Sequence, residues 1–275
     1  PAGRSAAHPR ARPRAPAPPA ASEQGAMAAT VSRAAGPASV AQLDRQASGL
    51  YERGDYAGAA EMGRRVLDAR REALGERHPE TLWTKARLAW LICAQGDIAG
   101  AAEMGRQALD AMREKLGERD PDTLWAMAVV ASALRAQGDI AAAAEMGRQA
   151  LDAMREVLGE RHPHTLWVMA RLALTLIAQG DIAGAAEMGR QALDAMREVL
   201  GERHPDTLWV KARLALTLIA QGDIAGAAEM GRQALDAMRE VLGERHPDTL
   251  WAMAVVASAL RAQGDIAAAA EMGRQ

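Results

Sequence analysis

Aromatic residues and cysteine are scarce in this sequence of 275 residues, which has no phenylalanine, two tyrosines, six tryptophans and one cysteine. Alanine, leucine, methionine, glutamate and arginine dominate instead, and these residues favour helices over strands. The single cysteine, Cys93, excludes an internal disulfide and fits a reducing compartment such as the cytoplasm. The composition therefore points to an all-α protein without a disulfide framework.

Long apolar runs and an excess of charge are also missing. No apolar segment approaches the roughly 20 residues that a membrane-spanning helix needs. The formal net charge is −2 at pH 7, which gives no reason to invoke a nucleic acid. We therefore expect a soluble, cytoplasmic chain that binds neither membranes nor nucleic acid.

The first 38 residues lack apolar periodicity and are nearly free of acidic residues, the first of which is Glu23. Alanine, proline and arginine dominate there, so we predict that residues 1–38 are disordered. Met27 is a candidate start of the native protein, with the preceding residues read from an upstream frame. Residues 39–275 form the second region.

A repeat of 42 residues fills this second region. A proline after Leu-Gly-Glu-Arg-His, or its Asp variant, recurs at Pro79, Pro121, Pro163, Pro205 and Pro247. A tryptophan follows in register at Trp83, Trp125, Trp167, Trp209 and Trp251. A period of this length is typical of stacked repeat proteins, which usually present a surface to other molecules.

Each unit is predicted to be an antiparallel pair of helices. In one unit, Pro205 suits the first turn of a helix, and apolar residues follow at helical spacing. Gly222 then ends this helix, Asp223 caps the next one, and Leu242 lies at its end.

Six such hairpins are expected in residues 39–275. The first runs from about Ser39 to Leu74, with Gly54 and Asp55 at its turn. The sixth is expected to be truncated, because residues 271–275 match residues 145–149, which lie in mid-helix.

The motif Leu-Gly-x-x-His-Pro-Asp-Thr-Leu, followed by Leu-Ala, Gln-Gly, Ala and Arg-x-Ala-Leu, resembles tetratricopeptide repeats. The 42-residue period and the His-Pro loop are similar to the kinesin light chain type in particular. This resemblance implies a right-handed superhelical solenoid whose first helices line a concave groove for peptides or protein segments. It implies no catalysis.

The first helices depart from the kinesin light chain pattern at the groove. That type usually carries Asn-Asn-Leu-Ala, whereas the matching stretches here are Ala-Arg-Leu-Ala at 86–89, 170–173 and 212–215 and Ala-Val-Val-Ala at 128–131 and 254–257. Since these asparagines are absent, the cargo specificity of kinesin light chains does not carry over.

By analogy with the family, the tryptophans face the concave side or its edge. Arg87, Arg171 and Arg213 lie four residues after three of them, where a guanidinium can stack on an indole. We therefore hypothesise a groove of tryptophans and arginines for acidic, hydrophobic peptides, interrupted at Val129 and Val255. Its residues are Trp83, Arg87, Trp125, Trp167, Arg171, Trp209, Arg213 and Trp251.

A packing role is the alternative for the same residues. Glycines lie inside the second helices, and a neighbouring indole could fill the space that each one leaves. They are Gly105, Gly147, Gly189 and Gly231. The arginines, in turn, could simply form ion pairs with nearby Glu or Asp.

No catalytic, metal or cofactor site is predicted. The recurring histidines at 78, 162, 204 and 246 lie in separate repeats, and the replacement of one by Asp120 favours a capping role. Cys93 has no histidine nearby in sequence, and no phosphate-binding loop occurs.

The preferred interpretation is a non-catalytic interaction module or scaffold that binds a protein or peptide partner in its groove. A cargo adaptor similar to kinesin light chain is one alternative, although no N-terminal heptad pattern is visible. The sensor or regulatory region of a larger signalling enzyme is another. The sequence leaves the oligomeric state open.

Overall fold

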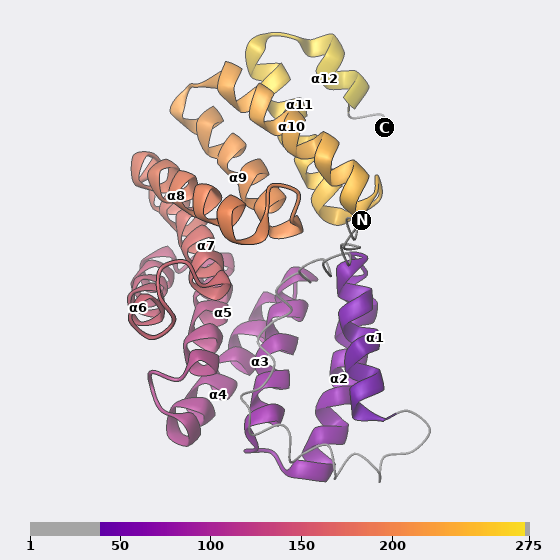
Figure 1. The fold of residues 1–275 in the computed structure, drawn as a ribbon, viewed down its shortest axis with the longest axis vertical. Coiled ribbons are helices and arrows are strands. Elements are labelled where there is room, and N and C mark those ends of the chain that lie inside the picture. Colours follow the sequence, from indigo (N-terminus) through magenta and orange to yellow (C-terminus); the bar gives the residue numbers. More distant parts are fainter. Residues whose placement is uncertain (1–38, 273–275) are drawn as a thin grey trace, which may run out of the picture.

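The computed structural model describes residues 39–272, which form twelve helices and no strands (Figure 1). The helices are α1 (Val40–Glu52), α2 (Tyr56–Leu74), α3 (Pro79–Ala94), α4 (Ile98–Leu116), α5 (Pro121–Gln137), α6 (Ile140–Leu158), α7 (Pro163–Gln179), α8 (Ile182–Leu200), α9 (Pro205–Gln221), α10 (Ile224–Leu242), α11 (Pro247–Gln263) and α12 (Ile266–Met272). The predicted all-α fold is confirmed, and the twelve helices pack in consecutive pairs. The predicted disorder of residues 1–38 falls outside the described residues.

Local capping sets the helix ends at the predicted positions. His204 caps α9 by accepting the backbone N–H of Asp206, and Pro205 occupies the first turn, where its missing N–H costs nothing. Gly222 ends α9 with φ of 87°, a left-handed conformation that favours glycine. Asp223 then caps α10, so a tight turn joins the two helices.

The hairpins stack in chain order, and each helix packs against the next one along the chain. Among the described helices from α3 to α11, odd-numbered neighbours also contact one another, whereas even-numbered ones do not. The stack therefore curves with the odd-numbered helices on its inner side, as Figure 1 shows for α3, α5, α7 and α9. The result is a right-handed superhelical solenoid with a concave face.

The core lies between successive hairpins and consists of leucine, methionine and alanine. Leu208, Leu235 and Met238, for example, are at most 1% exposed. No single hairpin could bury this surface, so stacking supplies the stability of the fold. Within residues 39–272, no helix is long and apolar enough to cross a membrane.

The glycines inside the even-numbered helices face aliphatic side chains rather than indoles. A methyl group added at Gly105 or Gly231 would meet Val130 or Val256, both at 3.1 Å. At Gly147 and Gly189 it would meet leucine side chains at 3.1 and 3.3 Å. The expectation that tryptophan fills these spaces was therefore wrong, because β-branched and leucine side chains of the next helix reach them first.

The curvature brings the first hairpin against the sixth. The turn between α1 and α2 lies beside the connection from α10 to α11 (Figure 1). Here Gly54 is in close contact with His246 and Pro247. The solenoid therefore closes on itself across its concave side.

Candidate functional site

The five repeated tryptophans form a column along the first turns of the odd-numbered helices. Trp83 and Trp125 are each only 5% exposed and belong to the core. Trp167, Trp209 and Trp251 are partly buried and pack against it. The column thus runs from the core at one end to a more accessible surface at the other.

Direct contacts between indoles hold the buried end of the column. The rings of Trp83 and Trp125 are tilted by 55° with centroids 4.5 Å apart. Those of Trp125 and Trp167 stack at 6.0 Å with an interplanar angle of 26°. Offset aromatic pairs of this kind add about 0.5–1.5 kcal/mol each beyond the area that they bury.

At the accessible end, arginines lie between the indoles. The guanidinium carbon of Arg171 is 5.1 Å from the ring of Trp167 and 5.6 Å from that of Trp209. That of Arg213 is 5.0 Å from Trp209 and 3.5 Å from Trp251. Arg171 and Arg213 are therefore each sandwiched between the tryptophans of two successive repeats.

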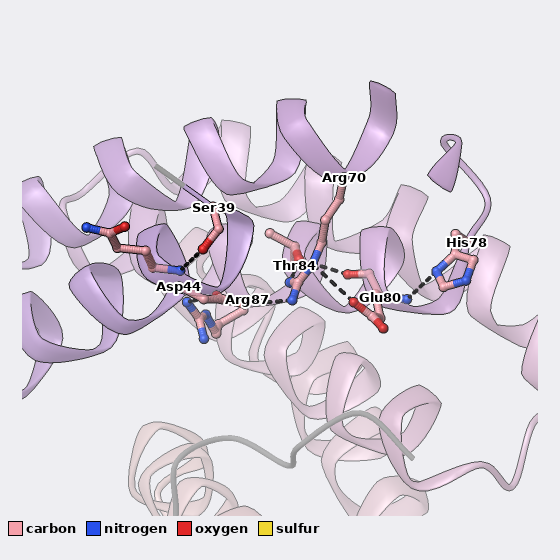
Figure 2. Close-up of polar contacts among 8 residues, drawn as sticks. Ser39, Asp44, Arg70, His78, Glu80, Thr84 and Arg87 are labelled. Atoms are coloured by element: carbon pink, nitrogen blue, oxygen red, sulfur yellow. Dashed lines mark hydrogen bonds and ion pairs between the residues drawn. The ribbon is translucent and has the colours of Figure 1, made fainter. Parts of the chain in front are cut away.

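The third predicted arginine, Arg87, has a different partner. It donates to Asp44 at 3.1 Å, and Arg70 donates to the same carboxylate at 2.6 Å (Figure 2). Arg70 also contacts Thr84 and lies 3.4 Å from Glu80. This network between α1, α2 and α3 neutralises Arg87, so the predicted alternative of an intramolecular ion pair describes this residue.

Arg171 and Arg213 have no such carboxylate within 4.0 Å among the described residues. Arg171 makes one long hydrogen bond, from Nε to Ser132 Oγ at 3.4 Å. The buried Nε of Arg213 has no hydrogen-bond partner in the described part of the chain. Burial lowers the pKa of each guanidinium to about 10, so both remain charged at neutral pH.

The surroundings of this arginine pair are cationic and apolar. Arg135 of α5 is close enough to both to lower their pKa values further by repulsion, while Asp248 opposes this effect. A small, mostly apolar pocket between α7 and α9 is lined in part by Ile177, Trp209 and Arg213. The positive charge of Arg213 therefore lies beside an apolar surface between α7 and α9.

Val129 and Val255 occupy the arginine position in the remaining two repeats and are 2% and 4% exposed. With Val129 in that place, Trp125 and Trp167 approach each other directly. The predicted series of arginines is thus reduced to Arg171 and Arg213.

The recurring histidines are helix caps. Nδ1 of each accepts the backbone N–H two residues later, and Asp120 does the same with its carboxylate, which confirms the capping prediction; the histidines are His78, His162, His204 and His246. The described residues hold no group of three or more potential metal ligands. Burial raises the pKa of the half-buried Cys93 thiol.

Sequence reasoning missed four residues that lie opposite the arginine pair. Tyr51 and Tyr56 belong to the first hairpin, and Asp206 and Asp248 lie in the first turns of α9 and α11. Each tyrosine is within electrostatic range of at least one of these carboxylates and of Arg171. The available signal was that both tyrosines of the chain flank a single turn, the one between α1 and α2.

A family model described as tetratricopeptide repeat matches residues 39–114, 91–156, 130–198, 190–240 and 212–275. No curated protein sequence gives a significant match.

Solved structures of three proteins resemble the fold. The crystal structure of a Podosopora anserina protein described as a kinesin light chain with nearly identical TPR-like repeats is 26% identical, with a TM-score of 0.57 over 72% of this chain and 93% of that chain. BtubC (BKLC) from P. vanneervenii is 23% identical, with a TM-score of 0.57 over 84% and 87% of the two chains. The apo form of RapI is 13% identical, with a TM-score of 0.60 over 86% and 80%.

Proposed function

Because the chain belongs to the tetratricopeptide repeat family, we propose that it is a non-catalytic interaction module that binds a partner protein through its concave face. Repeats of this kind form an extended inner surface rather than an enclosed pocket. In this proposal the module acts in the cytoplasm and needs no cofactor.

The observation that carries the proposal is the arginine pair. Arg171 and Arg213 are charged, half-buried and held between indoles without a nearby carboxylate partner. A carboxylate from a partner would supply the missing hydrogen bonds and charge, and hydrogen bonds to charged groups contribute about 1.5–3 kcal/mol each. Ile177 and Trp209 present apolar surface next to Arg213, against which a hydrophobic part of the same segment can pack.

The preferred ligand is therefore an acidic, hydrophobic segment of a protein or peptide. In this proposal Trp167, Trp209 and Trp251 form its accessible apolar surface, whereas Trp83, Trp125 and Arg87 support the fold from within.

Tryptophan fluorescence tests the proposal. We expect a short peptide of alternating Glu and Leu to change the emission of the chain and to protect part of it from iodide quenching. Arg213→Gln should weaken binding by about ten-fold, equivalent to about 1.4 kcal/mol. Arg213→Lys should lose part of the affinity, because lysine keeps the charge but not the planar stacking.

The matched control is Arg106→Gln on α4, which removes an arginine that is exposed. It should leave the affinity unchanged. If Arg106→Gln weakens binding as much as Arg213→Gln does, the arginine pair is not the binding site.

A cargo adaptor similar to kinesin light chain is a second candidate. The likeness to the Podosopora anserina structure supports it, since the two chains are 26% identical over most of that structure. Association with a heptad-containing motor chain, measured by co-purification, distinguishes this role from a free-standing receptor.

A further inference from the structure

The turn between α1 and α2 differs from the five equivalent turns. Its glycine, Gly54, is partly covered, because His246 and Pro247 lie against it. The equivalent glycines are exposed, and nothing would lie within 4 Å of an added methyl group at any of them; they are Gly96, Gly138, Gly180, Gly222 and Gly264. Of these six turn glycines, Gly54 alone therefore lies against a distant repeat.

The side chains of this turn also differ from those of the other repeats. Tyr56 stands where the five later hairpins have isoleucine, and Tyr51 stands where they have cysteine, arginine or isoleucine. The two tyrosine rings are 5.6 Å apart, and Tyr51 also meets Trp90 edge-on at 5.1 Å. An aromatic cluster thus replaces the usual aliphatic turn at the place where the ends of the solenoid meet.

Charged groups of the later repeats face this cluster. Asp248 raises the pKa of Tyr56, and Asp206 raises that of Tyr51, in each case added to a larger effect of burial. Arg171 lowers both. The tyrosines therefore lie within range of the same groups that form the candidate binding site.

We propose that the α1–α2 turn is an internal occupant of the concave face, seated on the first turns of α9 and α11, and that a partner must displace it to reach Arg171 and Arg213. The seating itself rests on the contact of Gly54 with His246 and Pro247 and on the hydrogen bond between the Tyr56 and Asp248 side chains. Displacement by a partner rests in addition on the proposed function. The contact then acts as an autoinhibitory clasp.

Replacement of Gly54 by Asn tests the clasp. Asparagine tolerates the left-handed conformation of this position, where φ is 76°, but its Cβ would overlap Pro247. Gly138→Asn is the matched control, because φ there is 91° and no atom lies near. Both positions have positive φ, and only at Gly54 does an added Cβ meet a distant repeat, so the comparison isolates the clasp from the cost of replacing a turn glycine.

Small-angle X-ray scattering and amide hydrogen exchange give the readout without any ligand. We expect Gly54→Asn to enlarge the radius of gyration and to speed exchange about ten-fold in the first turns of α9 and α11. Gly138→Asn should behave as wild type. Tyr56→Ile, which restores the residue of the other repeats, should shift both measurements in the same direction as Gly54→Asn. Equal scattering and exchange for all four proteins would overturn the clasp.

The Glu-Leu peptide then tests displacement. If the clasp is autoinhibitory, Gly54→Asn should bind the peptide several-fold more tightly than wild type and than Gly138→Asn. An opened variant that binds no more tightly than wild type overturns autoinhibition. If Gly54→Asn opens the molecule but none of the proteins binds the peptide, the clasp is supported and the proposed function is contradicted.

Discussion

Lys211 is a charged residue at a buried position. It is 6% exposed, and methionine stands at the same place in three other repeats, at Met127, Met169 and Met253. Burial lowers its pKa, and no carboxylate lies within 4.0 Å in the described part of the chain. We predict that Lys211→Met raises the free energy of unfolding at pH 7 by about 1–2 kcal/mol, measured by urea denaturation.

Lys85 provides the control, because its Nζ is 3.3 Å from Glu76 in the equivalent place. Lys85→Met should change stability by less than about 0.5 kcal/mol. The pH dependence has a defined sign. Because folding lowers the pKa of Lys211, the charged lysine lowers the free energy of unfolding at every pH below that folded-state pKa. This loss of stability disappears as the pH rises toward the ordinary lysine pKa of about 10.5. A Lys211→Met variant with wild-type stability would refute this account.

At the residue scale, sequence reasoning located the arginines and tryptophans but not their partners. The spacing of four residues correctly placed Arg171 on Trp167 and Arg213 on Trp209. The pairing of Arg87 with Asp44 was not foreseeable, because it joins helices of different repeats. The same holds for the difference in burial between Trp83 and Trp251, which depends on what packs beyond each repeat.

At the scale of the single helix, the internal glycines offer a graded test. At Gly63, an added methyl group would lie 3.4 Å from the flexible Cδ1 of Leu88; at Gly231, it would lie 3.1 Å from Cγ2 of the stiff Val256. Alanine favours a helix over glycine by roughly 1 kcal/mol. We predict that Gly63→Ala raises the free energy of unfolding by about 0.5–1 kcal/mol, as measured by urea denaturation. Gly231→Ala should leave this free energy unchanged or lower it. Equal gains at both sites would show that packing is not what separates them.

Helix boundaries were the most predictable feature of the elements. Proline, an N-terminal capping residue and a C-terminal glycine mark each end locally, so the predicted span from Pro205 to Leu242 matches the two observed helices. What fills the space opposite the glycines was less predictable. That choice depends on the register between neighbouring helices, which local sequence does not encode.

At the scale of the whole molecule, stability is expected to vary along the stack. Among the described helices, α12 packs only on α11, and Leu250 and Ile266 are 49% and 62% exposed. We predict that amide hydrogen exchange is fastest in α12 and slowest in α5 to α8, which have neighbours on both sides. Uniform protection across the stack would instead indicate a single cooperative unit.

The solenoid itself followed from the repeat period, but its closure did not. Each repeat is rotated slightly relative to the one before it, and these rotations add up along the solenoid. The total rotation from the first hairpin to the sixth decides whether the α1–α2 turn reaches α11. Only the unusual pair Tyr51 and Tyr56 marked the place in advance.

The contact of Gly54 with His246 and Pro247 also limits how the number of repeats in the gene can change. Residues 117–149 and 243–275 differ only at Asp120 and His246, so units of the array are similar enough to misalign during recombination and to be gained or lost in multiples of 42 codons. An extra unit would carry Pro247 one step farther along the superhelix and away from Gly54. Selection for a closed molecule would therefore fix the number of units between the two contact points while leaving the sequence within each unit free to drift.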